Sequence, residues 1–204
     1  MRIVLPLAAL VVVAACGPSA TVDGVPEGAR DARPFPRPVD SYRMTSRDRL
    51  VDLLAAPGVA SEREIRALGP AVDSALADLA NEHGLSEVVR LEAVTCLGYY
   101  QNKRARLLLR SILTDPVWDK PYRMAALEAM VRSMGSEAYE TLKQYASDGD
   151  ADIRTVAVRG LGKIGGAGAV ALLKSLQLTE REPQVIQALD EALMELTRSP
   201  FEVN

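Results

Sequence analysis

Between residues 46 and 198, apolar positions recur with the period of an α-helix. In the segment 150–164, five apolar residues follow the i, i+3, i+4, i+8, i+11 spacing of a single helix face. They are Ile153, Val156, Ala157, Leu161 and Ile164. The same periodicity predicts helices at 46–56 and near 61–69, 70–83, 86–100, 102–114, 117–134, 136–147, 150–164, 167–178 and 181–198. No segment shows convincing strand alternation, so the sequence predicts an all-α fold.

Similar segments recur along this region at a fixed interval. One set begins at four leucines that are 33, 33 and 31 residues apart, and a second set begins at alanines that fall between them. The starting residues are Leu76, Leu109, Leu142, Leu173, Ala93, Ala126 and Ala157. Two interleaved sets at one period predict a repeated pair of helices. Ser61 with Glu64, and Thr179 with Glu182, have capping-box spacing, so we expect helices to begin after Ser61 and Thr179.

The repeated segments resemble HEAT repeats, especially the short bacterial repeats first named from phycobiliprotein lyases. In that pattern an acidic residue precedes "VR", and small and aliphatic residues then lead to "ALG". The segments "DADIRTVAVRGLGKIG" from Asp150 and "SEVVRLEAVTCLG" from Ser86 fit it. The resemblance covers roughly residues 61–198 and implies a right-handed α-solenoid. The unit from Asp115 departs from the pattern, and we interpret the difference as an enlarged turn that Trp118 plugs; the alternative is that Trp118 contacts a partner.

One hexapeptide, Gly160-Leu161-Gly162-Lys163-Ile164-Gly165, matches the dinucleotide-binding fingerprint G-x-G-x-x-G. That fingerprint binds a pyrophosphate only where a strand leads into a glycine turn that opens a helix. Here Gly160 and Gly162 fall late in a predicted helix and align with Cys96 and Gly98 of a sister repeat. We therefore interpret the glycines as positions where neighbouring helices approach closely, and we expect no nucleotide.

Three arginines occupy equivalent positions in successive repeats, Arg90, Arg123 and Arg154. The resemblance to HEAT proteins implies that each pairs with an acidic residue of an adjacent turn and forms a structural ladder along the stack. Three acidic residues stand three or four positions before these arginines, where the family places the partner. They are Glu87, Asp119 and Asp150.

A second basic series lies on the second helix of each pair. The core-facing positions of helix 102–114 are Ala105, Leu108, Leu109 and Ile112, and they turn two arginines outward. With their counterparts in later repeats these arginines form a stripe, composed of Arg106, Arg110, Tyr139, Lys143 and Lys174. The resemblance implies that second helices line the concave side of the solenoid, so the stripe is our candidate surface for a protein partner. The alternative is an ordinary solvated helix face.

The N-terminus carries a different signal. After Arg2 comes an apolar run from Ile3 to Ala15 that is too short to span a bilayer as a mature helix, and it predicts a signal peptide over residues 1–15. The run ends in Val13-Ala14-Ala15-Cys16, which resembles the lipobox of bacterial lipoproteins. This resemblance implies a diacylglycerol on Cys16 and, in many bacteria, a further acyl chain such as palmitate. The alternative is an ordinary secretory signal with a chance cysteine.

The rest of the chain fits an anchored protein. Residues 16–45 are rich in proline and glycine and predict a flexible tether, followed by the solenoid at 46–198 and a tail at 199–204. Gly17 stands where an aspartate, in Gram-negative lipoproteins, marks retention in the inner membrane. We therefore expect the periplasmic side of the outer membrane.

Composition narrows the function classes. The formal net charge of −3 argues against nucleic-acid binding, including the activity of a HEAT-like DNA glycosylase. His83 is the only histidine, so no metal site or catalytic triad stands out, and Cys96 fits a small buried hydrophobe. We expect no enzyme, no cofactor and no small-molecule substrate, but a scaffold that binds an unknown protein partner. The alternatives are a chromophore lyase or isomerase, against which the export signal argues, and a purely structural spacer.

Overall fold

The computed structural model describes residues 45–198. Within this range the secondary structure is helical and contains no strand, so the all-α expectation is confirmed. The helices are α1 (Ser46–Ala55), α2 (Glu62–Ala67), α3 (Val72–Asn81), α4 (Glu87–Leu97), α5 (Lys103–Thr114), α6 (Lys120–Met134), the 3-10 helix η2 (Gly135–Ala138), α7 (Tyr139–Tyr145), α8 (Ala151–Ile164), α9 (Gly166–Gln177) and α10 (Pro183–Arg198). Each lies within a few residues of its predicted range.

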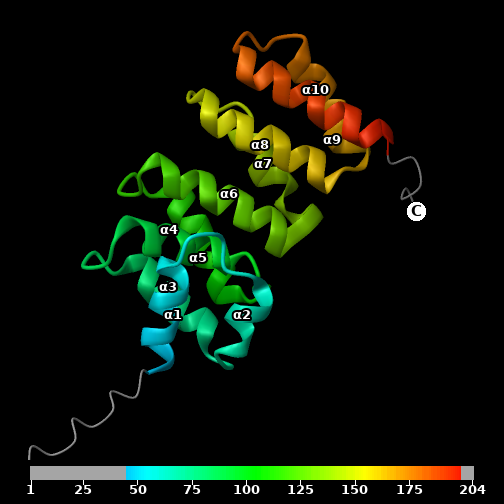
Figure 1. Cartoon of the computed structure of the whole chain (residues 1–204). Coiled ribbons are helices and arrows are strands. Elements are labelled where there is room, and N and C mark those ends of the chain that lie inside the picture. The colour runs from blue at the N-terminus through cyan, green and yellow to red at the C-terminus, as the bar shows by residue number, and fades with distance from the viewer. Residues whose placement is uncertain (1–44, 199–204) are drawn as a thin grey trace, which may run out of the picture. The chain divides into compact units, whose positions relative to one another are not determined.

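The helices form two layers, as expected of an α-solenoid. The first helices of the pairs pack on one another in the order α4, α6, α8 and α10, which Figure 1 shows as successive steps along the stack. Each second helix packs on the first helix of the following repeat: α3 on α4, α5 on α6, α7 on α8 and α9 on α10. Every repeat therefore covers the apolar face of its neighbour, and the core runs along the stack without a break.

Of the two helix starts predicted from capping boxes, the one at Ser61 is confirmed. At Ser61 the side chain accepts from the backbone amide of Glu64, and the Glu64 carboxylate accepts from the amide of Ser61, which completes the expected capping box. The expected box at Thr179 is wrong. The Thr179 hydroxyl donates to the carbonyl of Leu176, and the amide of Glu182 donates to the carboxylate of Glu180. The Thr179 hydroxyl is therefore used within the preceding turn and does not cap a helix. Helix α10 begins at Pro183.

The glycines of the G-x-G-x-x-G match are helix-packing positions. A Cβ atom added to Gly162 of α8 would lie 2.7 Å from the Cβ of Ala192 in α10, and one added to Gly98 of α4 would lie 2.9 Å from the Cα of Ala129 in α6. At the contact between α6 and α8 the glycine stands on the later helix and the larger residue on the earlier one. A Cβ added to Gly160 of α8 would lie 2.9 Å from a methyl of Val131 in α6. The same pair of positions thus touches at each repeat boundary, and glycine occupies one side each time.

The expectation of an enlarged turn before α6 is wrong. The turns that precede the first helices, 82–86, 115–119, 146–150 and 178–182, are equal in length. The difference between repeats therefore lies in the residues of the turn and not in their number. Trp118 occupies a turn of ordinary size, where it is half-buried and packs its ring edge against Tyr122 with the centroids 5.3 Å apart.

The signal peptide, the lipidated Cys16, the tether up to residue 44 and the tail at 199–204 lie outside the described residues. Among residues 45–198, no helix combines the length and the apolar character needed to cross a bilayer.

Candidate functional site

The structure divides the predicted basic stripe into two groups. Arg106 donates to Glu137 of η2 at 2.5 Å and keeps only 30% of its side chain exposed, so it links α5 to the next repeat. Tyr139 of α7 donates its hydroxyl to the carbonyl of Gly168 in α9, at 3.4 Å. These two side chains connect neighbouring repeats.

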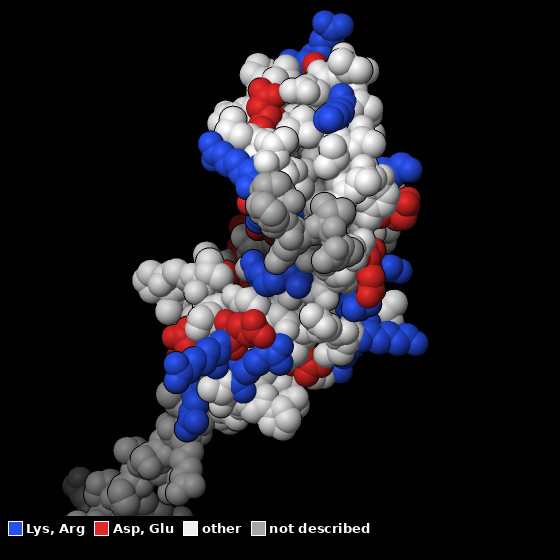
Figure 2. All heavy atoms as spheres, turned by 90° about the vertical axis from the view of Figure 1, so that its right-hand side faces the viewer, with Lys and Arg blue, Asp and Glu red and all other residues white. Residues whose placement is uncertain are grey.

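The other three members of the stripe, Arg110, Lys143 and Lys174, are exposed. Within residues 45–198 none of them forms an ion pair with an acidic side chain. Arg110 borders a shallow hollow of about 320 Å³ with Gln144 and Tyr145 of α7. In Figure 2, which shows one face of the molecule, basic and acidic side chains are interspersed and no patch of a single sign covers the surface.

The arginine series has a clearer structural role. Arg154 of α8 binds the carboxylate of Glu180 through Nε at 2.9 Å and Nη2 at 3.1 Å, and it also donates to the carbonyls of Asp148 and Gly149. Only 14% of the Arg154 side chain and 10% of the Glu180 side chain are exposed. The hydrogen bonds from Arg154 lower the pKa of Glu180 to about 2, although burial opposes the shift. This two-bond pair ties α8 to the turn before α10.

Arg123 of α6 makes the equivalent contact one repeat earlier. Its Nη2 lies 3.2 Å from the carboxylate of Asp148, and its guanidinium lies 5.8 Å from the centre of the Tyr145 ring. The carboxylate again comes from the turn before the next first helix. Arg123 and Arg154 thus form two successive connections of the same kind.

The acidic partners expected for these arginines are wrong. Within the described part of the chain, none of Glu87, Asp119 and Asp150 pairs with the arginine of its own repeat, and Asp150 instead lies 3.2 Å from Nζ of Lys120. A residue three or four positions before an arginine lies on or beside the same helix, whereas the guanidinium reaches forward to the next turn. The observed partners, Asp148 and Glu180, share the third position of their turns. This shared position was visible in the sequence once the repeats were aligned by their turns.

Arg90 of α4 differs from its two counterparts. Its Nε donates to the carbonyl of Ala80 at 3.1 Å, and its guanidinium lies 5.1 Å from the centre of the Tyr122 ring and 5.8 Å from that of Trp118. No carboxylate of residues 45–198 pairs with it. The third residue of the turn that should supply the carboxylate is Val117.

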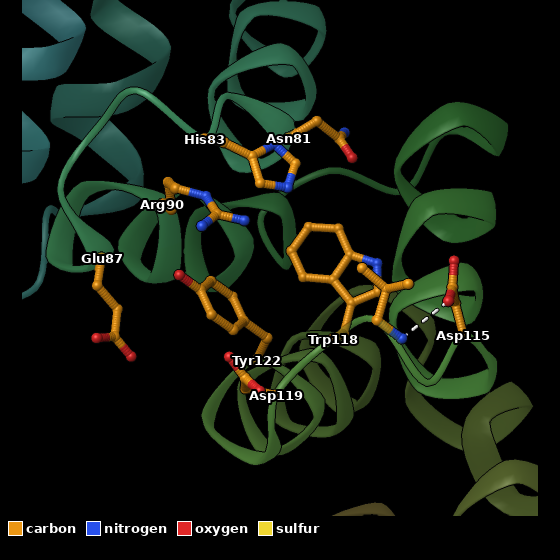
Figure 3. A pocket seen from close by; sticks show the side chains of 9 residues that line it. Asn81, His83, Glu87, Arg90, Asp115, Trp118, Asp119 and Tyr122 are labelled. Carbon is orange, nitrogen blue, oxygen red and sulfur yellow. Dashed lines mark hydrogen bonds between the residues drawn. The ribbon is translucent and has the colours of Figure 1, made fainter.

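A cavity of about 370 Å³ opens beside Arg90. Figure 3 shows the guanidinium amid the side chains of His83, Trp118 and Tyr122, with the Glu87 carboxylate turned away from it. The Tyr122 hydroxyl is buried and has no hydrogen-bond partner among the described residues, and burial raises its pKa. Because Arg90 and Tyr122 both line it, this cavity is the most chemically distinct site in the described structure.

Other reactive side chains are scattered. Cys96 is fully buried in α4, as expected of a small hydrophobe, and burial together with the nearby Glu92 carboxylate raises the pKa of its thiol. His83 is exposed in the turn after α3. Among residues 45–198, histidine, cysteine and acidic side chains do not gather in a group that could hold a metal ion.

Comparison with known families agrees with the architecture. The family of HEAT repeats matches the chain twice, at residues 73–151 and 118–194, and together the two matches cover more than half of its length. They span α3 to α10, the part of the stack in which the arginines and the glycine contacts recur. No curated protein gave a match of its own.

Proposed function

The chain belongs to the HEAT-repeat family, and from this premise we propose that it is a non-catalytic scaffold that binds a protein partner while a lipid on Cys16 holds it at a bacterial membrane. HEAT repeats are suited to a scaffold or interaction module because stacking produces an extended surface from short units. The observation that carries the proposal is the recurrence, on successive second helices, of an exposed basic side chain that forms no ion pair within residues 45–198. These side chains are Arg110 on α5, Lys143 on α7 and Lys174 on α9.

The surface defined by these three residues favours an acidic or mixed protein surface. Solvated charges bind weakly one by one, but several on one face steer a partner of opposite charge and fix its orientation. Arg106 and Tyr139 take no direct part, because their contacts to Glu137 and Gly168 hold the second helices in register. The proposed partner surface is therefore narrower than the stripe predicted from the sequence.

A charge-reversal experiment tests this surface. The full chain with Arg110→Glu, Lys143→Glu and Lys174→Glu is crosslinked in cells and its partners are identified by mass spectrometry. The matched control reverses three exposed basic residues away from the second helices, Arg49, Arg63 and Arg181, and so changes the net charge equally. We expect the control to recover the wild-type partner and the first variant to lose it. Equal recovery by both variants would exclude this surface.

Membrane attachment is tested separately. We expect the wild-type chain to incorporate labelled palmitate and to sediment with membranes, and the Cys16→Ser chain to lose both properties. We further propose the outer membrane, on the basis of Gly17. In a Gram-negative host, Gly17→Asp should move the protein to the inner-membrane fraction, and unchanged fractionation would contradict that assignment.

We propose a non-catalytic function for two reasons. The sequence has a single histidine, and the thiol of Cys96 is buried with a raised pKa, which makes it a poor nucleophile. Partner binding without substrate turnover is the expected behaviour of the purified chain.

A further inference from the structure

Three equivalent arginines meet three equivalent turns, and one of the three contacts lacks its acid. Arg123 binds Asp148 and Arg154 binds Glu180, and both carboxylates stand at the third position of the following turn. The turn that faces Arg90 has Val117 at that position. Val117 is 74% exposed and lines the cavity beside Arg90. The cavity is therefore located where the next two repeats of the same chain hold a carboxylate.

The guanidinium of Arg90 is already oriented for such a group. Its Nε is fixed by the carbonyl of Ala80, and the Tyr122 and Trp118 rings hold it by cation–π contact. Within residues 45–198 its terminal nitrogens donate to no acceptor. Two such N–H groups can bind one carboxylate side by side, the arrangement in which arginine is most selective.

A second, independent observation comes from Tyr122. Its side chain is 97% buried, yet its hydroxyl has no acceptor among the described residues, and the residue lines the same cavity. Buried hydroxyl groups are nearly always hydrogen-bonded in folded proteins. Among residues 45–198, the cavity is therefore bordered by a cation without a counter-ion and by a tyrosine whose buried hydroxyl has no acceptor.

We propose that this cavity binds a carboxylate of a protein partner, seated on Arg90 in the place that Asp148 and Glu180 take in the following repeats. The acidic residues around the cavity, Glu87, Asp115 and Asp119, oppose every anion and a multiply charged phosphate or nucleic acid most strongly, so Arg90 favours a ligand with a single negative charge. The apolar surfaces of Val117 and Trp118 suit the carbon atoms that carry the carboxylate. The ligand is a glutamate or aspartate side chain, or the carboxylate at a chain end.

This site goes beyond the proposed function, since it uses the turns beside α4 and α6, whereas the surface of Arg110, Lys143 and Lys174 uses the second helices. The proposal for the Arg90 cavity and the proposal for the second-helix surface can each be wrong while the other holds. Loss of partner recovery on charge reversal of the second helices, with normal carboxylate binding at Arg90, would support both.

Trp118 makes the test direct, because it is the only tryptophan in the chain. The purified full chain is titrated with three blocked peptides: acetyl-Gly-Leu-Gly-Glu-Gly-amide, the same peptide with Gln in place of Glu, and the Gln peptide with a free C-terminal carboxylate. We expect a saturable change in Trp118 fluorescence with a carboxylate peptide and none with the uncharged one. Binding of the Glu peptide alone indicates a side-chain carboxylate as the ligand, and binding of the free-ended peptide alone indicates a chain-end carboxylate. Binding of both indicates a site for any carboxylate. Equal binding of the uncharged peptide, or no binding of either carboxylate peptide at millimolar concentration, overturns the proposal.

Two substitutions locate the binding. Arg90→Gln should raise the Kd of the bound peptide at least tenfold, while Arg110→Gln, an equal charge change on the second helices, should leave it unchanged. Val117→Asp places a carboxylate at the vacant third position of the turn. It should weaken peptide binding at least tenfold by occupying Arg90 from within the chain, and it should raise the urea midpoint of unfolding. Val117→Asn is the uncharged control of the same shape. If Arg90→Gln does not fold, the comparison of Val117→Asp with Val117→Asn decides, and equal binding by the two rejects the site.

Discussion

Gly162→Ala tests the tightest of the glycine contacts between the described helices. The added Cβ would lie 2.7 Å from the Cβ of Ala192 and 3.2 Å from its Cα. Carbon atoms in van der Waals contact stand about 3.5–4.0 Å apart, so α8 and α10 would have to separate by roughly 1 Å. Both obstructing atoms are fixed to the helix and cannot rotate away. Overpacking of this kind costs about 1–3 kcal/mol, and we place it near the upper end because no side chain can move aside.

Part of that loss is offset by the substitution itself. Alanine favours a helix interior over glycine by about 1 kcal/mol. The expected net effect is a loss of about 2 kcal/mol in the free energy of unfolding, measured by urea denaturation followed by circular dichroism at 222 nm. Amide hydrogen exchange in α10 should accelerate roughly 30-fold, because 1.4 kcal/mol corresponds to a factor of ten.

The control and the refutation are both available in the chain. At Gly149 an added Cβ meets nothing within 4 Å, so Gly149→Ala should stay within about 1 kcal/mol of the wild type. Adding Ala192→Gly to Gly162→Ala removes the obstructing Cβ and should restore at least about 1 kcal/mol through coupling of the two sites. If Gly162→Ala proves as stable as the wild type, the close approach of α8 and α10 is not a packing constraint and the account of this glycine is wrong.

Further predictions concern single contacts. Gly160→Ala should cost about 1 kcal/mol less than Gly162→Ala in the same urea assay, because the nearest atoms are side-chain methyls of Leu142 and Val131 that can shift; an equal or greater loss would contradict this. Glu180→Gln should lower the free energy of unfolding by about 1–3 kcal/mol at pH 7, the range for a hydrogen bond to a charged group. The pKa of Glu180 is lowered in the folded state, so the stabilisation from its pair with Arg154 is present above about pH 4.5 and is lost as the pH falls towards about 2. Unfolding free energies measured from pH 6 to pH 2 should therefore decline less steeply in the variant, and parallel curves would show that the pair does not titrate. In a Cys16→Ser chain, Cys96 should resist a thiol reagent until the protein unfolds, and rapid labelling under native conditions would show that its burial is incomplete.

The fold could be predicted almost completely from the sequence, because every repeat supplies the same information again. The apolar stripe of α8 was recognisable from its spacing, and Ile153, Val156, Ala157 and Leu161 are buried as expected. The interpretation of Gly160 and Gly162 as packing residues is confirmed by the short distances to α6, α7 and α10. These features depend on local periodicity, which does not require knowledge of which helices touch.

The contacts between repeats were predicted less well, because they depend on the direction in which a side chain extends. Arg106 lies on the outward side of α5, as its spacing indicates, yet it reaches Glu137 of the next repeat and is only partly exposed. Proximity in sequence suggested that Asp150 serves Arg154, but Arg154 extends forward to Glu180. Long side chains extend over several ångströms of neighbouring surface. Helical spacing therefore predicts where the side chain leaves the helix but not which residue its charged group contacts.

The glycine contacts and the arginine contacts between repeats differ in the substitutions that they tolerate. At the glycine contacts, the partner is alanine at two repeat boundaries and valine at the boundary between α6 and α8, and glycine on the opposite helix leaves room for it each time. The arginine contacts lie at the ends of the helices, where an absent carboxylate leaves a cavity instead of collapsing the core. With Val117 at the position of the acid the stack stays intact, and Arg90 lines a cavity. A repeat protein can acquire a binding site in this way by losing one of its internal contacts at a turn, while the same loss at a helix interface would separate the repeats.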